Sequence, residues 1–209
     1  MASRSGVRVE VDIGSILPDV GGHGDAAGNP VDGSVVLPTV TDKTDTPAAD
    51  RPSGTDRVRE HARRLGLDVE VVERPEAGSL QEAARLLDLE PGDIAKSLVV
   101  KRHDGDFLFA LIPGDRQISW PKLRTLVGVN KLSMPHQDVA LAATGYERGT
   151  ITPLGSSTAW PVYLDESFAG RRIAMGAGAH GHSAYVDADA LAAALGATVA
   201  DISEPLPDR

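Results

Sequence analysis

The pattern of hydrophobic and polar positions separates a polar N-terminal quarter from a regularly patterned remainder. Residues 1–54 contain no Phe, Tyr or Trp and are rich in Gly, Asp, Pro and Thr. Such a segment buries too little apolar surface to offset the conformational entropy that ordering costs. We therefore predict a disordered N-terminal tail over residues 1–54, a folded domain over residues 55–204 and a short C-terminal tail over residues 205–209.

Apolar residues at helical spacing, bounded by caps, predict five helices within the folded part. A capping box, Ser79-Leu80-Gln81-Glu82, marks the start of the second helix. The predicted helices lie near residues 55–65, 80–87, 120–126, 135–144 and 188–195.

Short apolar or alternating runs predict strands between these helices. Asp104-Gly105 is a tight-turn signal, so residues 94–112 read as a β-hairpin. Helices and strands mix without a regular βαβ repeat, which favours a single mixed α/β domain with one central mixed β-sheet flanked by helices. The predicted strands lie near residues 67–72, 94–100, 107–112, 161–164, 172–175 and 184–186, with a last short element at 199–202.

Lys96 lies inside the strand run Ile94-Ala95-Lys96-Ser97-Leu98-Val99-Val100. Alternation along a strand places it on the same face as Ile94, Leu98 and Val100, where an unpaired charge is costly. Either the strand is a sheet edge and Lys96 reaches water, or Lys96 lines a pocket and meets an anionic or carbonyl ligand.

Charge and composition narrow the classes of function. The 209-residue chain has a formal net charge of −9 and no cysteine, which excludes disulfides, thiolate metal sites and a cysteine nucleophile. No apolar run approaches the roughly 18 residues of a membrane helix, so we expect no membrane association and a cytoplasmic location. An acidic surface does not attract nucleic acid by bulk charge, so binding would need a local basic patch. Candidates for that patch are Arg116, Lys122, Arg124, Lys131, Arg148, Arg171 and Arg172.

Two segments, 144–155 and 176–181, carry more glycine than packing requires. Glycine lets backbone amides approach a ligand, and such amides can stabilise an oxyanion during ester hydrolysis. Tight turns are the alternative interpretation. His180 and His182 flank Gly181, but no third ligand is evident and no metal site is expected.

The order of these segments resembles the YbaK and prolyl-tRNA-editing family of aminoacyl-tRNA deacylases. The similarity runs from about Ser79 to Ile202 and rests on the lysine strand, on residues 144–155 as the closest match, and on residues 176–181. The resemblance implies a free-standing trans-editing enzyme that hydrolyses the ester of mischarged tRNA, with tRNA-Pro carrying a small wrong amino acid as the expected substrate. A second hydrolytic site is useful because one binding pocket discriminates poorly between similar small side chains.

The resemblance also implies roles for individual residues. Lys96 would hold the substrate terminus and favour charge developing on the ester, and the amide of Gly149 would stabilise the oxyanion. The resemblance further implies that a ribose hydroxyl of the substrate assists the attacking water, which fits a sequence without an evident Ser-His-Asp triad, and it implies no cofactor. Gly176 and Ser183 differ from the Ser and Asp of some relatives. The further expected substrate-binding residues are Ser97, Gly145, Tyr146, Thr150, Pro153, Gly176 and Ser183.

The expected partner is aminoacyl-tRNA, bound through its 3′ terminal adenosine, and prolyl-tRNA synthetase is a candidate protein partner. Two alternatives stay open. The first alternative is a non-catalytic binding module of the same fold, which recognises a tRNA end or a protein. The second is a hydrolase of another small acyl ester.

Overall fold

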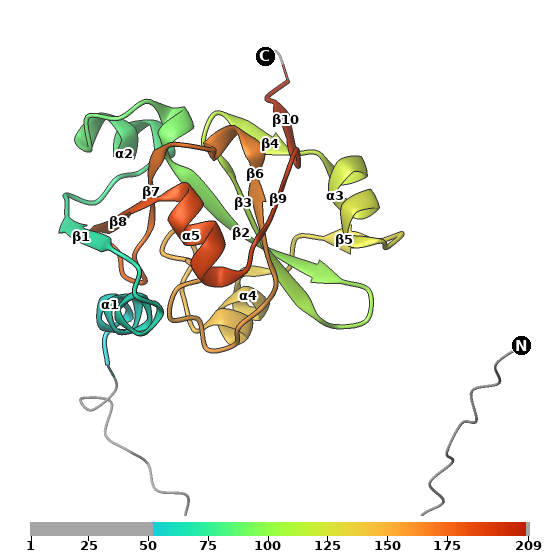
Figure 1. The fold of residues 1–209 in the computed structure, drawn as a ribbon, viewed down its shortest axis with the longest axis horizontal. Helices are drawn as coiled ribbons and strands as arrows, with labels where there is room; N and C mark the ends of the chain where they lie inside the picture. Colours follow the sequence, from blue (N-terminus) through green and yellow to red (C-terminus); the bar gives the residue numbers. More distant parts are fainter. Residues whose placement is uncertain (1–51, 208–209) are drawn as a thin grey trace, which may run out of the picture. The chain divides into compact units, whose positions relative to one another are not determined.

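The structure is a computed structural model that describes residues 52–207 (Figure 1). The predicted tail over residues 1–54 lies outside these residues apart from its last three. The predicted C-terminal tail begins at Pro205, which is the last residue of a short strand.

The five predicted helices are present among the described residues. They are α1 (Gly54–Leu65), α2 (Leu80–Leu86), α3 (Trp120–Val127), α4 (Gln137–Thr144) and α5 (Ala188–Leu195), with short 3-10 turns η2 (Pro91–Asp93) and η3 (Glu166–Phe168). The strands are β1 (Val69–Glu73), β2 (Ala95–Arg102), β3 (Phe107–Pro113), β4 (Arg116–Ile118), β5 (Leu132–Ser133), β6 (Val162–Asp165), β7 (Arg172–Gly176), β8 (His182–Asp187), β9 (Thr198–Ala200) and β10 (Ser203–Pro205).

Local sequence explains where the helices begin and end. The hydroxyl of Ser79 accepts a hydrogen bond from the Glu82 amide at 3.1 Å, as the capping box predicts, but the Glu82 carboxylate accepts from the amide of Gly78 at 2.8 Å. Ser119 occupies the N-cap position of α3 without a side-chain capping bond. Gly66 ends α1 in the left-handed conformation that glycine adopts without strain.

A five-stranded mixed sheet with strand order β5-β2-β3-β6-β9 forms the centre of the fold (Figure 1). The predicted hairpin pairs β2 with β3 in antiparallel register, with Lys96 opposite Ile112. Strands β6 and β9 continue the sheet in parallel. This arrangement confirms the predicted central mixed sheet.

The structure adds a three-stranded antiparallel sheet, β1-β8-β7, and a two-stranded β4–β10 ladder. Val69 of β1 pairs with Val186 of β8, a contact between distant parts of the chain that local patterning does not reveal. A bridge between Ile94 and Ala174 links the start of β2 to β7. The start of β2 therefore lies where the two larger sheets meet.

Strand β3 separates two hydrophobic clusters. Phe109 and Leu111 pack into the larger cluster, whereas Leu108, Ala110 and Ile112 pack into the second one. A strand buried on both faces has a continuous apolar sequence, and that is the sequence of residues 107–112. The hairpin that carries Lys96 is thus fixed from both sides.

Candidate active site

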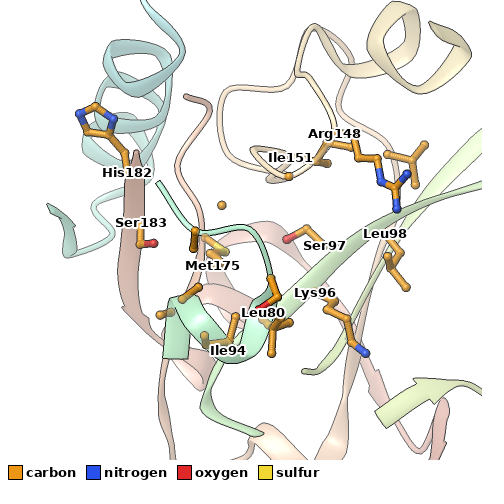
Figure 2. Close-up of a pocket in the computed structure, with 18 of the residues that line it drawn as sticks. Leu80, Ile94, Lys96, Ser97, Leu98, Arg148, Ile151, Met175, His182 and Ser183 are labelled. Carbon is orange, nitrogen blue, oxygen red and sulfur yellow. The ribbon is translucent and has the colours of Figure 1, made fainter. Parts of the chain in front are cut away.

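A pocket of about 700 Å³ opens where the two larger sheets meet (Figure 2). It is walled by one face of α2, the first half of β2, residues 134–135 with the first half of α4, the segment 148–149 with Ile151, and the neighbouring ends of β7 and β8. Five of the predicted site residues line it: Lys96, Ser97, Gly149, Gly176 and Ser183. The lysine strand and both glycine-rich segments, which lie far apart in the sequence, therefore meet at one cavity.

Lys96 is half-buried, and its ammonium group donates a hydrogen bond to the backbone carbonyl of Arg116 in β4. Burial lowers the pKa of Lys96 because it disfavours the charged form, and the nearby carboxylate of Asp115 partly opposes that effect. Figure 2 shows the amine turned away from Ser97. Lys96 thus lines the pocket while its charged end is held by the protein's own backbone.

Ser97 lies on the opposite face of β2, as strand alternation predicts. Its hydroxyl oxygen is buried and has no hydrogen-bond partner among residues 52–207. In Figure 2 this oxygen points toward the side of the pocket on which Met175 and Ile151 lie. A buried hydroxyl normally has a partner, so Ser97 carries hydrogen-bonding capacity that no residue of the described chain uses.

Gly149 occupies the tip of the first glycine-rich loop with φ of +91°, a backbone conformation that favours glycine. Its amide donates no hydrogen bond to any of residues 52–207. The next residue, Thr150, donates its amide to the carbonyl of Glu147 at 3.0 Å and closes the tip of the loop. The Gly149 amide is consequently available to a ligand, as an oxyanion donor must be.

The other predicted residues of this loop do not line the pocket. Tyr146 is buried, and its hydroxyl donates to the carbonyl of Leu154 at 2.8 Å. Thr150 is also buried, and its hydroxyl donates to the carbonyl of Glu147 at 2.9 Å. Pro153 is buried and Gly145 caps α4. These four residues therefore stabilise the conformation of the loop without lining the pocket.

The second glycine-rich segment lies against the first. The amide of Gly178 donates to the carbonyl of Thr150 at 2.9 Å, and a Cβ atom at Gly176 would lie 2.4 Å from the carbonyl oxygen of Ile151. Nε2 of His180 lies 3.0 Å from a carboxylate oxygen of Glu147. Gly176 therefore permits close packing of β7 against the loop that carries Gly149.

Only basic side chains supply charge to the lining of the pocket within residues 52–207. They are Lys96, Arg74 and Arg148, and no Asp or Glu contributes to the walls. Arg74 donates to the buried hydroxyl of Ser183 at 2.9 Å. Arg148 enters the lining from the residue before Gly149. In a chain with a net charge of −9, this local excess of positive charge favours an anionic ligand.

Arg148 is the one member of the predicted basic patch that lines the pocket. Arg116 bonds to Ser203, and Lys122, Arg171 and Arg172 form ion pairs with carboxylates of the described chain. Arg74, Met175 and the helix α2 were not predicted as site elements. The capping box of α2 marks a helix start and not a site, and Arg74 reaches the pocket because β1 pairs with β8.

The fold and this pocket define a small α/β domain with a cleft between two sheets, whose charged lining side chains are basic. The chain belongs to the aminoacyl-tRNA editing domain family, whose match covers residues 74–194. This membership confirms the resemblance inferred from the sequence.

Individual relatives match shorter stretches of the chain. The chain is 35% identical over 88 residues to the "Putative Cys-tRNA(Pro)/Cys-tRNA(Cys) deacylase EbsC" of Enterococcus faecalis, covering 42% of this chain and 54% of that protein. It is 34% identical over 116 residues to the proline–tRNA ligase of Heliobacterium modesticaldum, covering 55% of this chain and 20% of the ligase. The chain thus spans only part of the length of these curated relatives.

A solved structure extends the comparison over more of the fold. It is described as "Crystal structure of a putative trans-editing enzyme for prolyl tRNA synthetase" and matches with a TM-score of 0.68 and 29% identity, over 74% of this chain and 99% of that one. Its match confirms the mixed α/β fold. Within residues 52–207 there is no helix with the length and apolar character needed to cross a membrane.

Proposed function

We propose that this protein is a trans-editing deacylase, which hydrolyses the ester between a small wrong amino acid and tRNA-Pro. The proposal rests on one observation above all: a single pocket brings together Lys96, Ser97 and the free amide of Gly149, with only basic charges in its walls. The names of the relatives, which include proline–tRNA ligases and a Cys-tRNA(Pro) deacylase, support tRNA-Pro as the substrate.

The pocket suits ester hydrolysis by a water molecule that the substrate itself helps to orient. Water attacks the ester carbonyl carbon, the carbonyl oxygen becomes an oxyanion, and the amide of Gly149 donates a hydrogen bond to it. The bond to the ribose oxygen then breaks, and that oxygen takes the proton that the attacking water has given up, so the tRNA leaves with a free terminal hydroxyl and the amino acid as its carboxylate. No carboxylate lines the described pocket, which fits positioning of the water by a neighbouring ribose hydroxyl of the substrate.

Lys96 has a defined part in this proposal. Its ammonium group is held by the neutral carbonyl of Arg116, and an anionic oxygen is a stronger acceptor than a carbonyl. A phosphate or developing oxyanion of the substrate would therefore compete for Lys96. The basic side chains of Arg74 and Arg148 would favour the same anionic terminus.

Deacylation of tRNA-Pro charged with Ala, Cys, Ser or Thr tests the proposal. Wild-type protein should hydrolyse at least one of these esters, and Lys96→Ala should lower the rate by at least about a hundredfold with its fold intact by circular dichroism. Lys101→Ala is the matched control, since Lys101 lies on the same strand but is exposed and outside the pocket. Equal rates for the wild type and Lys96→Ala would remove Lys96 from the mechanism.

A second candidate, a non-catalytic binding module, is favoured by the engagement of Lys96 with Arg116. In that case mischarged tRNA would bind to the wild type without turnover. A filter-binding assay run beside the deacylation panel distinguishes the two functions.

A further inference from the structure

We propose that helix α1 positions both glycine-rich loops of the site, with Arg57 and His61 as its positioning residues. The expected effect of α1 on the rate of hydrolysis rests on the proposed function. The contacts between α1 and the loops do not depend on it. Helix α1 (Gly54–Leu65) ends before residue 74, where the family match begins. None of the α1 residues lines the pocket.

Arg57 holds the start of the first loop. Its guanidinium donates to the carbonyl of Gly145 at 2.8 Å and lies 4.2 Å from the centre of the Tyr146 ring. A cation over an aromatic face is attracted by the ring, so Arg57 contacts two consecutive residues in different ways. The hydroxyl of Tyr146 in turn donates to the carbonyl of Leu154, which ties the start of the loop to its end.

His61 holds the end of the same loop. Its Nδ1 atom accepts a hydrogen bond from the amide of Gly155 at 2.8 Å, so the ring is neutral at that nitrogen. A Cβ atom at Gly155 would lie 2.6 Å from the carbonyl oxygen of Arg57, so the loop runs directly against the helix backbone. Arg57 and His61 are four residues apart on one helix face. One turn of α1 therefore fixes both ends of the loop that presents Gly149.

The first residue of α1 reaches the second loop. A Cβ atom at Gly54 would lie 1.8 Å from the carbonyl oxygen of Gly178, and the amide of Gly178 donates to the carbonyl of Thr150. Gly54 of α1 thus packs against Gly178, and Gly178 is hydrogen-bonded to Thr150, the neighbour of Gly149. These contacts do not involve Arg57 or His61.

The other face of α1 carries exposed ion pairs within the helix and, among residues 52–207, makes no contact of this kind with the loops. Arg59 pairs with Asp56 at 3.6 Å, and Arg63 pairs with Glu60 at 2.9 Å, with all four side chains at least half exposed. Arg57 differs from these arginines because its partners are a backbone carbonyl and a buried ring of the site loop. This contrast provides a control on the same helix.

Steady-state kinetics on the best substrate of the deacylation panel tests the positioning role. Arg57→Met and His61→Leu should each lower kcat at least tenfold and leave KM within about twofold, because a displaced oxyanion donor weakens the transition state alone. Arg57→Lys keeps a cation over Tyr146, and His61→Asn keeps an acceptor near the Nδ1 position, so both should recover most of the activity. Arg59→Met should behave as the wild type.

Hydrogen exchange gives a readout that does not depend on activity. The amides of Thr150 and Gly178 are bonded within and between the loops, and they should exchange at least tenfold faster in Arg57→Met than in Arg59→Met. If the wild type hydrolyses no ester, the proposed function fails and exchange alone decides the role of α1. Unchanged exchange overturns the inference, and so does a lowered melting temperature with kcat and exchange equal to the wild type.

Discussion

The close packing of β7 against the Gly149 loop makes Gly176→Ala a sharp test of the site. A Cβ atom there would lie 2.4 Å from the carbonyl oxygen of Ile151 and 2.7 Å from that of Thr150. Both neighbours are backbone atoms and cannot rotate away. To move from 2.4 Å to the 3.0 Å that Cβ contacts require, the loop must retreat by about 0.6 Å.

That displacement has two separable costs. Overpacking of this kind destabilises a protein by about 1–3 kcal/mol, which corresponds to a loss of roughly 2–12 °C in melting temperature for a domain of this size. The loop also carries Gly149, and displacements approaching 1 Å at a reacting centre can lower rates by about a hundredfold. We expect Gly176→Ala to lower kcat by roughly tenfold to a hundredfold at a temperature where the variant is fully folded.

Urea denaturation and single-turnover deacylation measure the two costs separately. Gly92→Ala is the control, because its Cβ atom would meet only the side-chain carboxylate of Asp115, at 3.3 Å. A Gly176→Ala variant with wild-type stability and wild-type kcat would refute the close approach of β7 to the loop. A stability loss without a rate loss would show that the position of the loop does not limit hydrolysis.

Three further outcomes follow from single side chains. Arg148→Gln should reduce the slope of log KM against log salt by about 0.7, the share of one single-strand phosphate contact, and an unchanged slope would contradict contact with the tRNA backbone. Ser97→Ala should raise KM without lowering the urea midpoint, because its hydroxyl has no partner in the described chain, and a clear loss of stability would contradict that geometry. Burial, and to a lesser extent the charge of Arg64, lowers the pKa of His61 below the ordinary histidine value of 6.5, so the unfolded state binds the proton more readily. The urea midpoint should therefore fall as pH falls from 6.5 toward the folded pKa, and this fall should be smaller in His61→Asn, as parallel titrations would show.

Local sequence predicted the helices and most strands, because caps, turns and periodicity act over a few residues. The capping box at Ser79 and the Asp104-Gly105 turn are such signals. The second sheet was not predicted, because the pairing of β1 with β8 joins distant segments whose register no local pattern records.

For the site, alternation correctly separated Lys96 from Ser97 but could not say which face of β2 meets the cavity. The ammonium of Lys96 bonds to β4, a strand too short to be recognised from three residues, and it is Ser97 whose hydroxyl points into the pocket. The role of His61 was also missed. Its helical position predicts an exposed face, and the acceptor role depends on a loop that follows it by more than ninety residues.

The pairing of β2 with β3 has a consequence for how such a site can change over time. Lys96 and Ser97 are adjacent, and the pleat sends them to opposite sides of the sheet. Insertion or loss of one residue upstream within the strand would exchange the two, sending the cation to the face that Ser97 now occupies and the hydroxyl toward β4. Substitution of Lys96 or of Ser97 therefore changes one face of the sheet without changing the other. An insertion or deletion in this strand keeps both side chains on their present faces only if it adds or removes two residues.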